Sequence, residues 1–177
     1  MPTFAPAALI DAIAFAAHKH RNQRRKNVEA SPYINHPIAL AHVLAIEAKV
    51  HDDQVLIAAI LHDTLEDTET SFEELKEHFG LLIAETVAEV TDDKSLPKPR
   101  RKALQIEHAP HLSKRAQLVK LADKICNLRD VASSPPHDWP LQRRREYFDW
   151  AKQVVVGVRG VHPRLEELFD AAYAARP

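Results

Sequence analysis

The chain has 177 residues, with 24 lysines and arginines against 25 aspartates and glutamates, and a single cysteine. This length predicts one domain, residues 1–177, and the balanced charge excludes a general attraction to nucleic acid or to an anionic membrane. One cysteine excludes an internal disulfide, which favours a reducing compartment and hence the cytoplasm.

The first predicted helix covers about residues 6–20. Its apolar residues recur at helical spacing, and Asp11 interrupts the apolar stretch with no basic residue before it, so we expect neither a signal peptide nor a membrane span. A basic run follows at residues 21–26, and taken alone this pattern is typical of a solvated helix end.

His36 lies at the predicted entrance of the next helix. Pro32 and Pro37 fix the backbone on either side of it, and Pro37 suits the first position of a helix that continues over residues 38–48. After polar capping residues comes the run Val55–Leu61, which is apolar nearly all round. This run predicts a central, buried helix.

The remainder of the chain is predicted as helices separated by short breaks. Ser71 and Glu74 form a capping box, and the helix they open closes at Gly80. Prolines mark breaks at residues 91–99 and 133–140. With only 3 glycines and no alternating strand pattern, the chain is expected to adopt a compact, all-α fold. Further helices are expected at residues 82–90, 100–107, 114–131, 141–158 and 164–175.

Polar residues follow apolar runs where a core is expected. His62 and Asp63 come directly after the buried run, and Asp123 follows another apolar helical segment. Buried charge needs a partner, and a divalent cation coordinated by imidazole and carboxylate provides one. Together with His36, these residues offer two histidines and two aspartates. This mixed nitrogen and oxygen set favours a cation that accepts octahedral geometry, such as Mn2+, while the lack of cysteine ligands argues against structural zinc.

Two further carboxylates are candidates for the catalytic groups. Glu66 and Asp67 lie four residues beyond His62 and Asp63, so we expect each to lie one turn above a ligand on the same side of the helix. A carboxylate there can orient or deprotonate a water for attack on phosphorus. The pattern therefore indicates a hydrolase that needs no covalent nucleophile.

Six blocks of the sequence, spread over almost the whole chain, resemble one known family. They are AAHKHRNQRRKN, PYINHPIALA, AAILHDTLEDT, VTDDKSLPK, VKLADKICNLRD and EYFDWA. In this order and spacing they are similar to the HD superfamily of metal-dependent phosphohydrolases, and within it to the small alarmone hydrolases and the hydrolase domain of bacterial RelA/SpoT proteins. A bare His-Asp dipeptide would be far less specific.

The resemblance implies an HD-domain helical fold and a small nucleotide as partner, without nucleic acid or membrane. The reaction it implies removes the 3′-diphosphate of ppGpp or pppGpp, the stringent-response alarmones, giving GDP or GTP and pyrophosphate, with Mn2+ as cofactor. No synthetase activity is expected. His36, His62, Asp63 and Asp123 align with the family's metal ligands, and Glu66 and Asp67 with its catalytic acidic pair. Positions that match the family's substrate contacts are Arg25, Lys26, Lys98, Asn127, Arg143 and Tyr147.

Other hypotheses remain open at this point. The same chemistry could act on an adenine alarmone, (p)ppApp, or on the 2′-phosphate of NADPH. A nucleotide-binding module that senses alarmones without hydrolysing them is a second possibility, although it would not need Glu66 and Asp67. A third is a helical bundle that binds no metal. No sustained heptad is present, and the sequence gives no prediction of oligomeric state.

Overall fold

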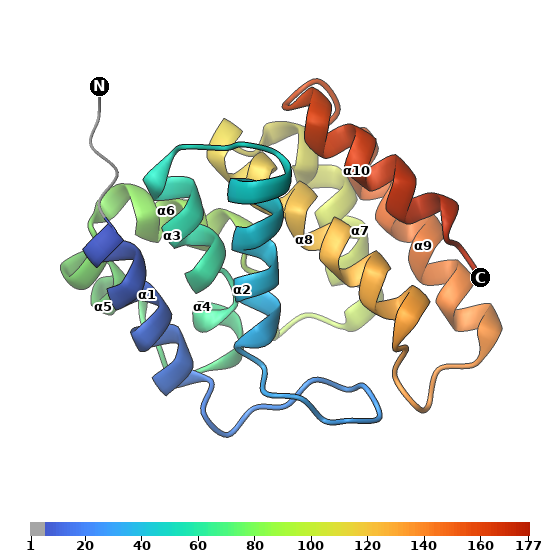
Figure 1. Ribbon diagram of the computed structural model, residues 1–177, viewed down its shortest axis with the longest axis horizontal. Helices are drawn as coiled ribbons and strands as arrows, with labels where there is room; N and C mark the ends of the chain where they lie inside the picture. Colours follow the sequence, from blue (N-terminus) through green and yellow to red (C-terminus); the bar gives the residue numbers. More distant parts are fainter. Residues whose placement is uncertain (1–5) are drawn as a thin grey trace.

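The computed structural model describes residues 6–177 and is built from α-helices joined by loops, of which the one between α1 and α2, residues 20–34, is long (Figure 1). Within these residues the extended pairing is limited to an isolated antiparallel bridge between Arg24 and Pro32, so the expectation of an all-α fold is confirmed. The helices are α1 (Pro6–Lys19), α2 (Asn35–His42), the π-helical turn η1 (Val43–Glu47), α3 (Asp53–Leu61), α4 (Thr64–Asp67), α5 (Phe72–Phe79), α6 (Leu81–Val90), α7 (Lys98–His108), the 3-10 turn η2 (Ala109–His111), α8 (Lys114–Ser133), α9 (Leu141–Val156) and α10 (Pro163–Ala174).

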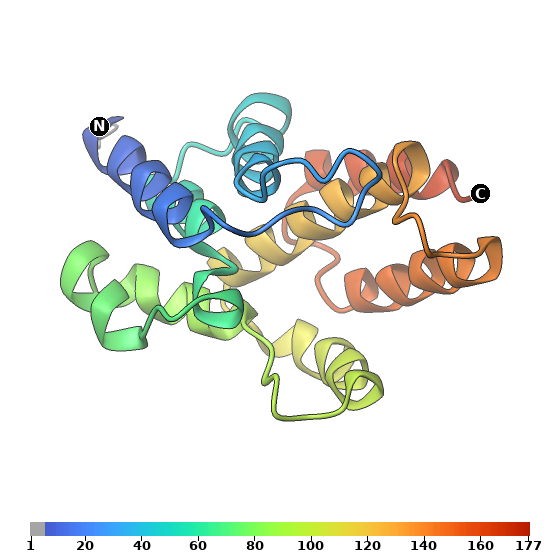
Figure 2. The same ribbon diagram turned by 90° about the horizontal axis from the view of Figure 1, so that it is seen from below.

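The hydrophobic core is organised around α3 and α8. Every residue of α3 from Val55 to Leu61 is buried, as its apolar surface on all sides predicts. α3 packs against α1, α2, α6 and α8, while α8 also contacts α9 and α10. Figure 2 shows α8 crossing the middle of the molecule, and Figure 1 shows α9 and α10 together on one side of it. Polar side chains at the end of α3 and along α8 therefore lie inside the molecule.

Local sequence signals fix where several helices begin and end. The Asp52 carboxylate accepts hydrogen bonds from the backbone N–H groups of Gln54 and Val55, at 3.0 and 3.4 Å, and so caps the start of α3. Ser71 caps α5 in the same way through Glu74 N–H. The Glu74 side chain, which a capping box directs to the backbone, instead pairs with Lys19 of α1. One half of the predicted capping box is therefore confirmed.

The helix that carries His36 differs from the sequence prediction in two ways. α2 begins at Asn35, so Pro37 occupies its third position rather than its first. Proline is tolerated there because the first turn of a helix has no acceptors for its N–H groups. The helix also ends in the π-helical turn η1 instead of continuing regularly to residue 48, with Ala48 N–H bonded to Val43 O at 2.9 Å.

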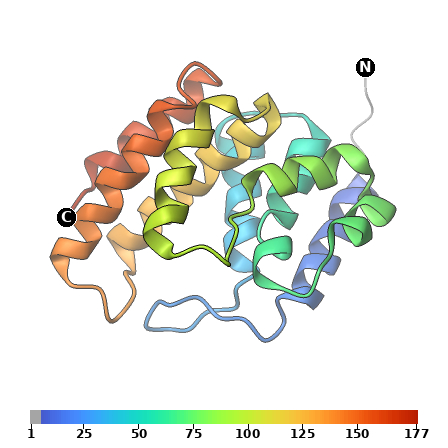
Figure 3. The same cartoon turned by 180° about the vertical axis from the view of Figure 1, so that it is seen from behind.

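The far ends of α7 and α9 meet at Gly157, which follows the last residue of α9. A Cβ atom at this position would lie 2.8 Å from Ala109 Cβ and 2.8 Å from Pro110 Cδ, both in η2. Only glycine fits this approach without displacement. Trp150 of α9 also donates a hydrogen bond from Nε1 to Lys102 O of α7, at 3.1 Å. Seen from behind, α7 and α9 lie side by side with the loop 91–97 leading into α7 (Figure 3).

No helix within residues 6–177 combines the length and the apolar character needed to cross a bilayer.

Candidate active site

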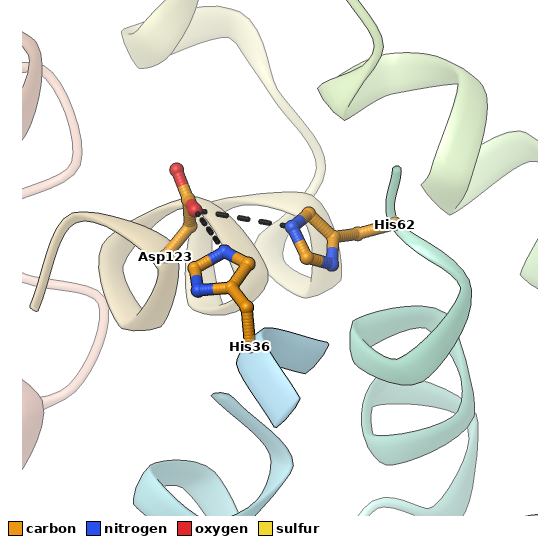
Figure 4. A group of neighbouring side chains, drawn as sticks. All are labelled: His36, His62 and Asp123. Atoms are coloured by element: carbon orange, nitrogen blue, oxygen red, sulfur yellow. Dashed lines mark hydrogen bonds and ion pairs between the residues drawn. The ribbon is translucent and has the colours of Figure 1, made fainter. Parts of the chain in front are cut away.

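Three of the four predicted metal ligands lie together in the interior (Figure 4). His36 comes from the first turn of α2, His62 follows the last residue of α3, and Asp123 lies in the middle of α8. One ligand atom of each lies within 4.8 Å of the others. His36 Nε2 is 3.2 Å and His62 Nε2 3.8 Å from Asp123 Oδ1. Segments far apart in sequence thus supply two imidazoles and one carboxylate to one point.

The hydrogen bonds of His62 leave one ring nitrogen available for a cation. Its Nδ1 lies 2.8 Å from the carbonyl oxygen of Ala59, which can only accept, so Nδ1 donates. Nε2 is buried with no hydrogen-bond partner of suitable geometry. Burial acts to lower the pKa of His62, but Asp63 and Asp123 outweigh it and raise the pKa to about 9. A divalent cation at this point would displace the proton, so that the Nε2 lone pair faces the two carboxylates. Two electron-rich groups facing each other in the core fit a divalent metal ion between them.

Asp63 lies beside this cluster rather than inside it. Its Oδ2 is 2.9 Å from His62 Nε2, and it accepts a hydrogen bond from the Tyr33 hydroxyl. Burial acts to raise the pKa of Asp63, but the neighbouring His62 and His36 outweigh it and hold the pKa well below its usual range. Asp63 is therefore an anion next to the histidines. The contribution of Tyr33 could not be found from sequence, because 30 residues separate the two partners.

Buried lysines on α8 accompany Asp123. Lys124 Nζ lies 3.1 Å from Asp123 Oδ2, and Lys120 Nζ donates to the carbonyl oxygen of Val90 at 3.0 Å. Burial lowers the pKa of Lys120, whereas Asp123 overcomes the effect of burial and raises that of Lys124. These lysines were not predicted as site residues, because lysines in an amphipathic helix are most often exposed. They partly neutralise the carboxylates of the interior.

The acidic pair Glu66 and Asp67 lies on α4, a single helical turn. The sequence predicts both on the same continuous helix as His62 and Asp63, and this prediction is wrong in detail because α3 ends at Leu61. The His62 ring and the Thr64 hydroxyl bond to carbonyl groups of the last turn of α3, and such side-chain bonds compete with helix propagation. The break directs α4 along a separate axis, yet both carboxylates still line the cavity that contains the histidines.

The two members of the pair have different surroundings. Glu66 accepts a hydrogen bond from Asp92 N–H at 3.0 Å, and burial, together with nearby carboxylates, raises its pKa to about 6. Asp67 accepts a hydrogen bond from Gln23 Nε2 at 2.8 Å and pairs with Lys94 of the 91–97 loop. Glu66 is thus suited to exchange a proton near neutral pH, while Asp67 is held on both carboxylate oxygens.

Three adjoining cavities surround these groups, with volumes of about 210, 510 and 630 Å³, and Tyr147 lines all of them. The smallest contains the histidines and the acidic pair. The six predicted substrate contacts all line one or more of these cavities. Arg25 and Asn127 line the cavities of about 210 and 510 Å³, and Lys26 lines the one of about 510 Å³. Lys98 and Arg143 line the cavity of about 630 Å³. The structure therefore brings the predicted ligands, acids and substrate contacts into one cleft.

Aromatic side chains form part of the outer wall. Arg143 lies over the ring of Trp139 at 4.5 Å, and Lys102 lies over Trp150 at 4.7 Å. Trp139 and Trp150, as large aromatic residues, are expected to act as packing anchors. They do pack against the core, but they also line the cleft, together with Tyr147. Lys102 was not predicted, because nothing in the sequence places it against an aromatic ring.

Comparisons with known proteins agree with this geometry. The family model described as HD domain matches residues 12–149. A Danio rerio protein named guanosine-3′,5′-bis(diphosphate) 3′-pyrophosphohydrolase MESH1 is 53% identical over 170 residues, covering 96% of this chain and 94% of its own. The Homo sapiens protein of the same name is also 53% identical over 170 residues, covering 96% and 95%. A solved structure described as a metazoan ortholog of SpoT that hydrolyzes ppGpp has a TM-score of 0.94 at 47% identity, over 98% of both chains.

Proposed function

Because this chain belongs to the HD domain family, we propose that it hydrolyses guanosine 3′,5′-bis(diphosphate), releasing GDP and pyrophosphate, and the corresponding pentaphosphate, releasing GTP. One observation carries the proposal. The histidine and aspartate cluster shares its cavity with Glu66 and Asp67, and this cavity adjoins others with basic and aromatic walls. Such a cleft combines phosphate binding with hydrolytic groups.

We propose that His36, His62, Asp63 and Asp123 together hold one Mn2+ ion. The mixture of imidazole and carboxylate donors suits this cation. Nε2 of His62, once the cation displaces its proton, and the anionic Asp63 provide the donors such an ion needs. When bound, the ion polarises a phosphoryl oxygen and so stabilises the charge that develops during hydrolysis.

The acidic pair activates the attacking water in this proposal. Glu66 accepts its proton at Oε1, since Oε2 already accepts the Asp92 N–H. Asp67, held by Gln23 and Lys94, orients the same water. The water oxygen forms a bond to the phosphorus next to the ribose, the bond from that phosphorus to O3′ breaks, and O3′ takes up a proton. Pyrophosphate and a free 3′-hydroxyl are the products.

The outer cleft recognises the nucleotide. Lys26, Lys98 and Arg143 supply positive charge for the phosphates, and Tyr147 with the neighbouring tryptophans supplies flat apolar surface for the purine. Lys98 shows how crowded these cations are, because burial and then the nearby Arg143, Lys26 and Arg101 lower its pKa. A polyanionic ligand would relieve this repulsion.

Product analysis tests the proposal directly. The purified protein is incubated with ppGpp labelled on the terminal 3′-phosphate, with Mn2+ or with chelator, and the products are separated. Labelled pyrophosphate and unlabelled GDP are expected only with the metal. Release of single phosphates, or cleavage at the 5′ side, would contradict the assignment. Measuring kcat/KM for ppGpp, pppApp and NADPH under the same conditions tests the substrate, and the assignment to ppGpp fails if ppGpp is the poorest of them.

A further inference from the structure

A buried histidine lies close to the acidic pair without belonging to it. His20 directly follows α1, and only 3% of its surface is exposed. It is separate from the His36, His62 and Asp123 cluster and does not line the cavity that holds the cluster. A buried imidazole needs a hydrogen-bond partner. The partner here is the side chain of Gln23, which also contacts Asp67 of the acidic pair.

A chain of hydrogen bonds joins His20 to Asp67 through Gln23. His20 Nδ1 lies 2.6 Å from Gln23 Oε1, and Gln23 Nε2 donates to Asp67 Oδ2 at 2.8 Å. The backbone of Gln23 is fixed as well, since its N–H donates to His20 O at 2.8 Å and its carbonyl accepts from Tyr33 N–H at 3.1 Å. The amide of Gln23 therefore has one end on the histidine and the other on the carboxylate.

The environment of the ring determines which nitrogen carries the proton. Nε2 of His20 is buried with no hydrogen-bond partner, and a buried N–H without an acceptor is costly. In the neutral ring the proton accordingly resides on Nδ1, which donates to Gln23 Oε1. This donor selects one orientation of the Gln23 amide. The opposite orientation would place a carbonyl oxygen against the Asp67 carboxylate.

We infer that His20 is a positioning residue for the hydrolysis: by donating to Gln23 it holds the amide so that Gln23 Nε2 fixes the Asp67 carboxylate that orients the water. The same ring packs on Tyr33 at a centroid distance of 4.8 Å, and the Tyr33 hydroxyl donates to Asp63. His20 thus supports one catalytic carboxylate by hydrogen bonds and one metal-site carboxylate by packing. The inference rests on the proposed function, because it gives Asp67 a role in turnover.

A double-mutant cycle tests whether His20 acts through Gln23. His20→Leu is expected to lower kcat for ppGpp about 10-fold with KM within about 2-fold, the scale of one hydrogen bond to a charged group. Gln23→Ala is expected to lower kcat by a similar or larger factor, and the double variant should be no slower than Gln23→Ala alone. His20→Asn, whose amide N–H can replace Nδ1, should restore kcat to within about 3-fold of the unmodified protein.

The inference would be overturned if the fold-losses in kcat of the two single variants multiplied in the double variant. It would also be overturned if His20→Asn were as slow as His20→Leu. His18→Leu is the matched control, because His18 is exposed near the same end of α1, and its kcat should stay unchanged. Nitrogen NMR of the unmodified protein gives a readout that needs neither folding of a variant nor turnover. Nδ1 of His20 should carry the proton, and an unprotonated Nδ1 contradicts the inference. If the unmodified protein left ppGpp intact, the proposed function would fail instead, and the ring NMR would still decide whether His20 orients Gln23.

Discussion

The inner and outer parts of the cleft are built in opposite ways. The inner part is formed by His36, His62 and Asp123, which come from or directly follow α2, α3 and α8, and these residues are buried or nearly so. The outer part is formed by residues 24–27 and 134–140 and by the exposed faces of α7 and α9. The core requires each buried polar group to have a partner, whereas the rim is constrained mainly by what it binds. Substitutions inside should therefore abolish chemistry, and those outside should weaken binding.

The largest effect is expected for Asp123→Asn. Asp123 Oδ1 faces both histidines. Asparagine replaces the carboxylate with a neutral amide, so the metal site loses one of its negatively charged donors. We expect ppGpp turnover to fall about 1000-fold or more and bound manganese, measured by elemental analysis, to be lost. The control is Asp130→Asn on the same helix, which pairs with Arg25 at the rim. Equal losses in both variants would erase the distinction between the two parts of the cleft.

Glu66→Gln should separate chemistry from metal binding within the inner part. Turnover is expected to fall about 100-fold, as for loss of a general base, while manganese remains bound. Asp67→Asn should behave similarly, because Asp67 contacts the same water in the proposed reaction. Glu69→Gln, an exposed neighbour, serves as the control and should leave kcat unchanged. Near-normal rates in both acidic variants would remove the pair from the mechanism.

The same Glu66→Gln change should stabilise the metal-free fold. Burial raises the Glu66 pKa from 4.5 to about 6, so the folded state binds a proton more tightly than the unfolded chain. The free energy of unfolding therefore decreases as the pH rises from 4.5 toward 6, and the full loss of stability is reached above about pH 6. Glutamine avoids it, so at pH 7 the free energy of unfolding should increase by about 1–2 kcal/mol after allowance for partial exposure.

Denaturant titrations with chelator present measure that difference. The gain should shrink as the pH is lowered and should be nearly absent at pH 4.5, where the unmodified side chain is largely protonated in the folded protein. A gain that is independent of pH would show that burial of the Glu66 charge is not its cause.

A smaller effect is expected at the rim from Arg143→Ala. Arg143 stacks on Trp139 and faces the cavity between α7 and α9, so its loss exposes the ring and removes one cation that we propose binds phosphate. KM for ppGpp should rise about 10-fold while kcat stays within about 2-fold. Arg145→Ala is the control, since Arg145 bonds to the carbonyl of Pro177 instead. A large fall in kcat for Arg143→Ala would place this residue with the inner groups.

Sequence patterns were most informative where the core imposes rules. The sequence shows the buried helix α3 as a run that is apolar on all sides, with Asp52 as its polar cap. It shows His62 and Asp123 as polar residues next to apolar runs, where a buried helix would be expected to continue with apolar ones. The basic residues of the rim gave no such signal, since Arg25 or Arg143 in isolation looks like an ordinary solvated cation. Their grouping followed from resemblance to a family and not from the pattern itself.

The features that the sequence missed depend on contacts between residues far apart in the chain, or on side chains that compete with the backbone for hydrogen bonds. Tyr33 reaches Asp63 and Gln23 reaches Asp67 only after the loop 20–34 folds back across the helices. The break between α3 and α4 depends on the Thr64 hydroxyl and the His62 ring bonding to carbonyl groups of the preceding turn. Periodicity treats these residues as continuing the helix, because it takes no account of bonds from side chains to the backbone.

The close approach at Gly157 makes the width of the outer cavity, where we propose that the nucleotide binds, depend on a contact outside that cavity. α7 and α9 carry opposite walls of the outer cavity, and their far ends meet where Gly157 lies against Ala109 and Pro110. A methyl group added at this point would push the two helix ends apart. The angle between α7 and α9 would then change, and with it the shape of the cavity between them. In Gly157→Ala protein, nucleotide affinity measured by calorimetry should fall although every binding side chain is retained.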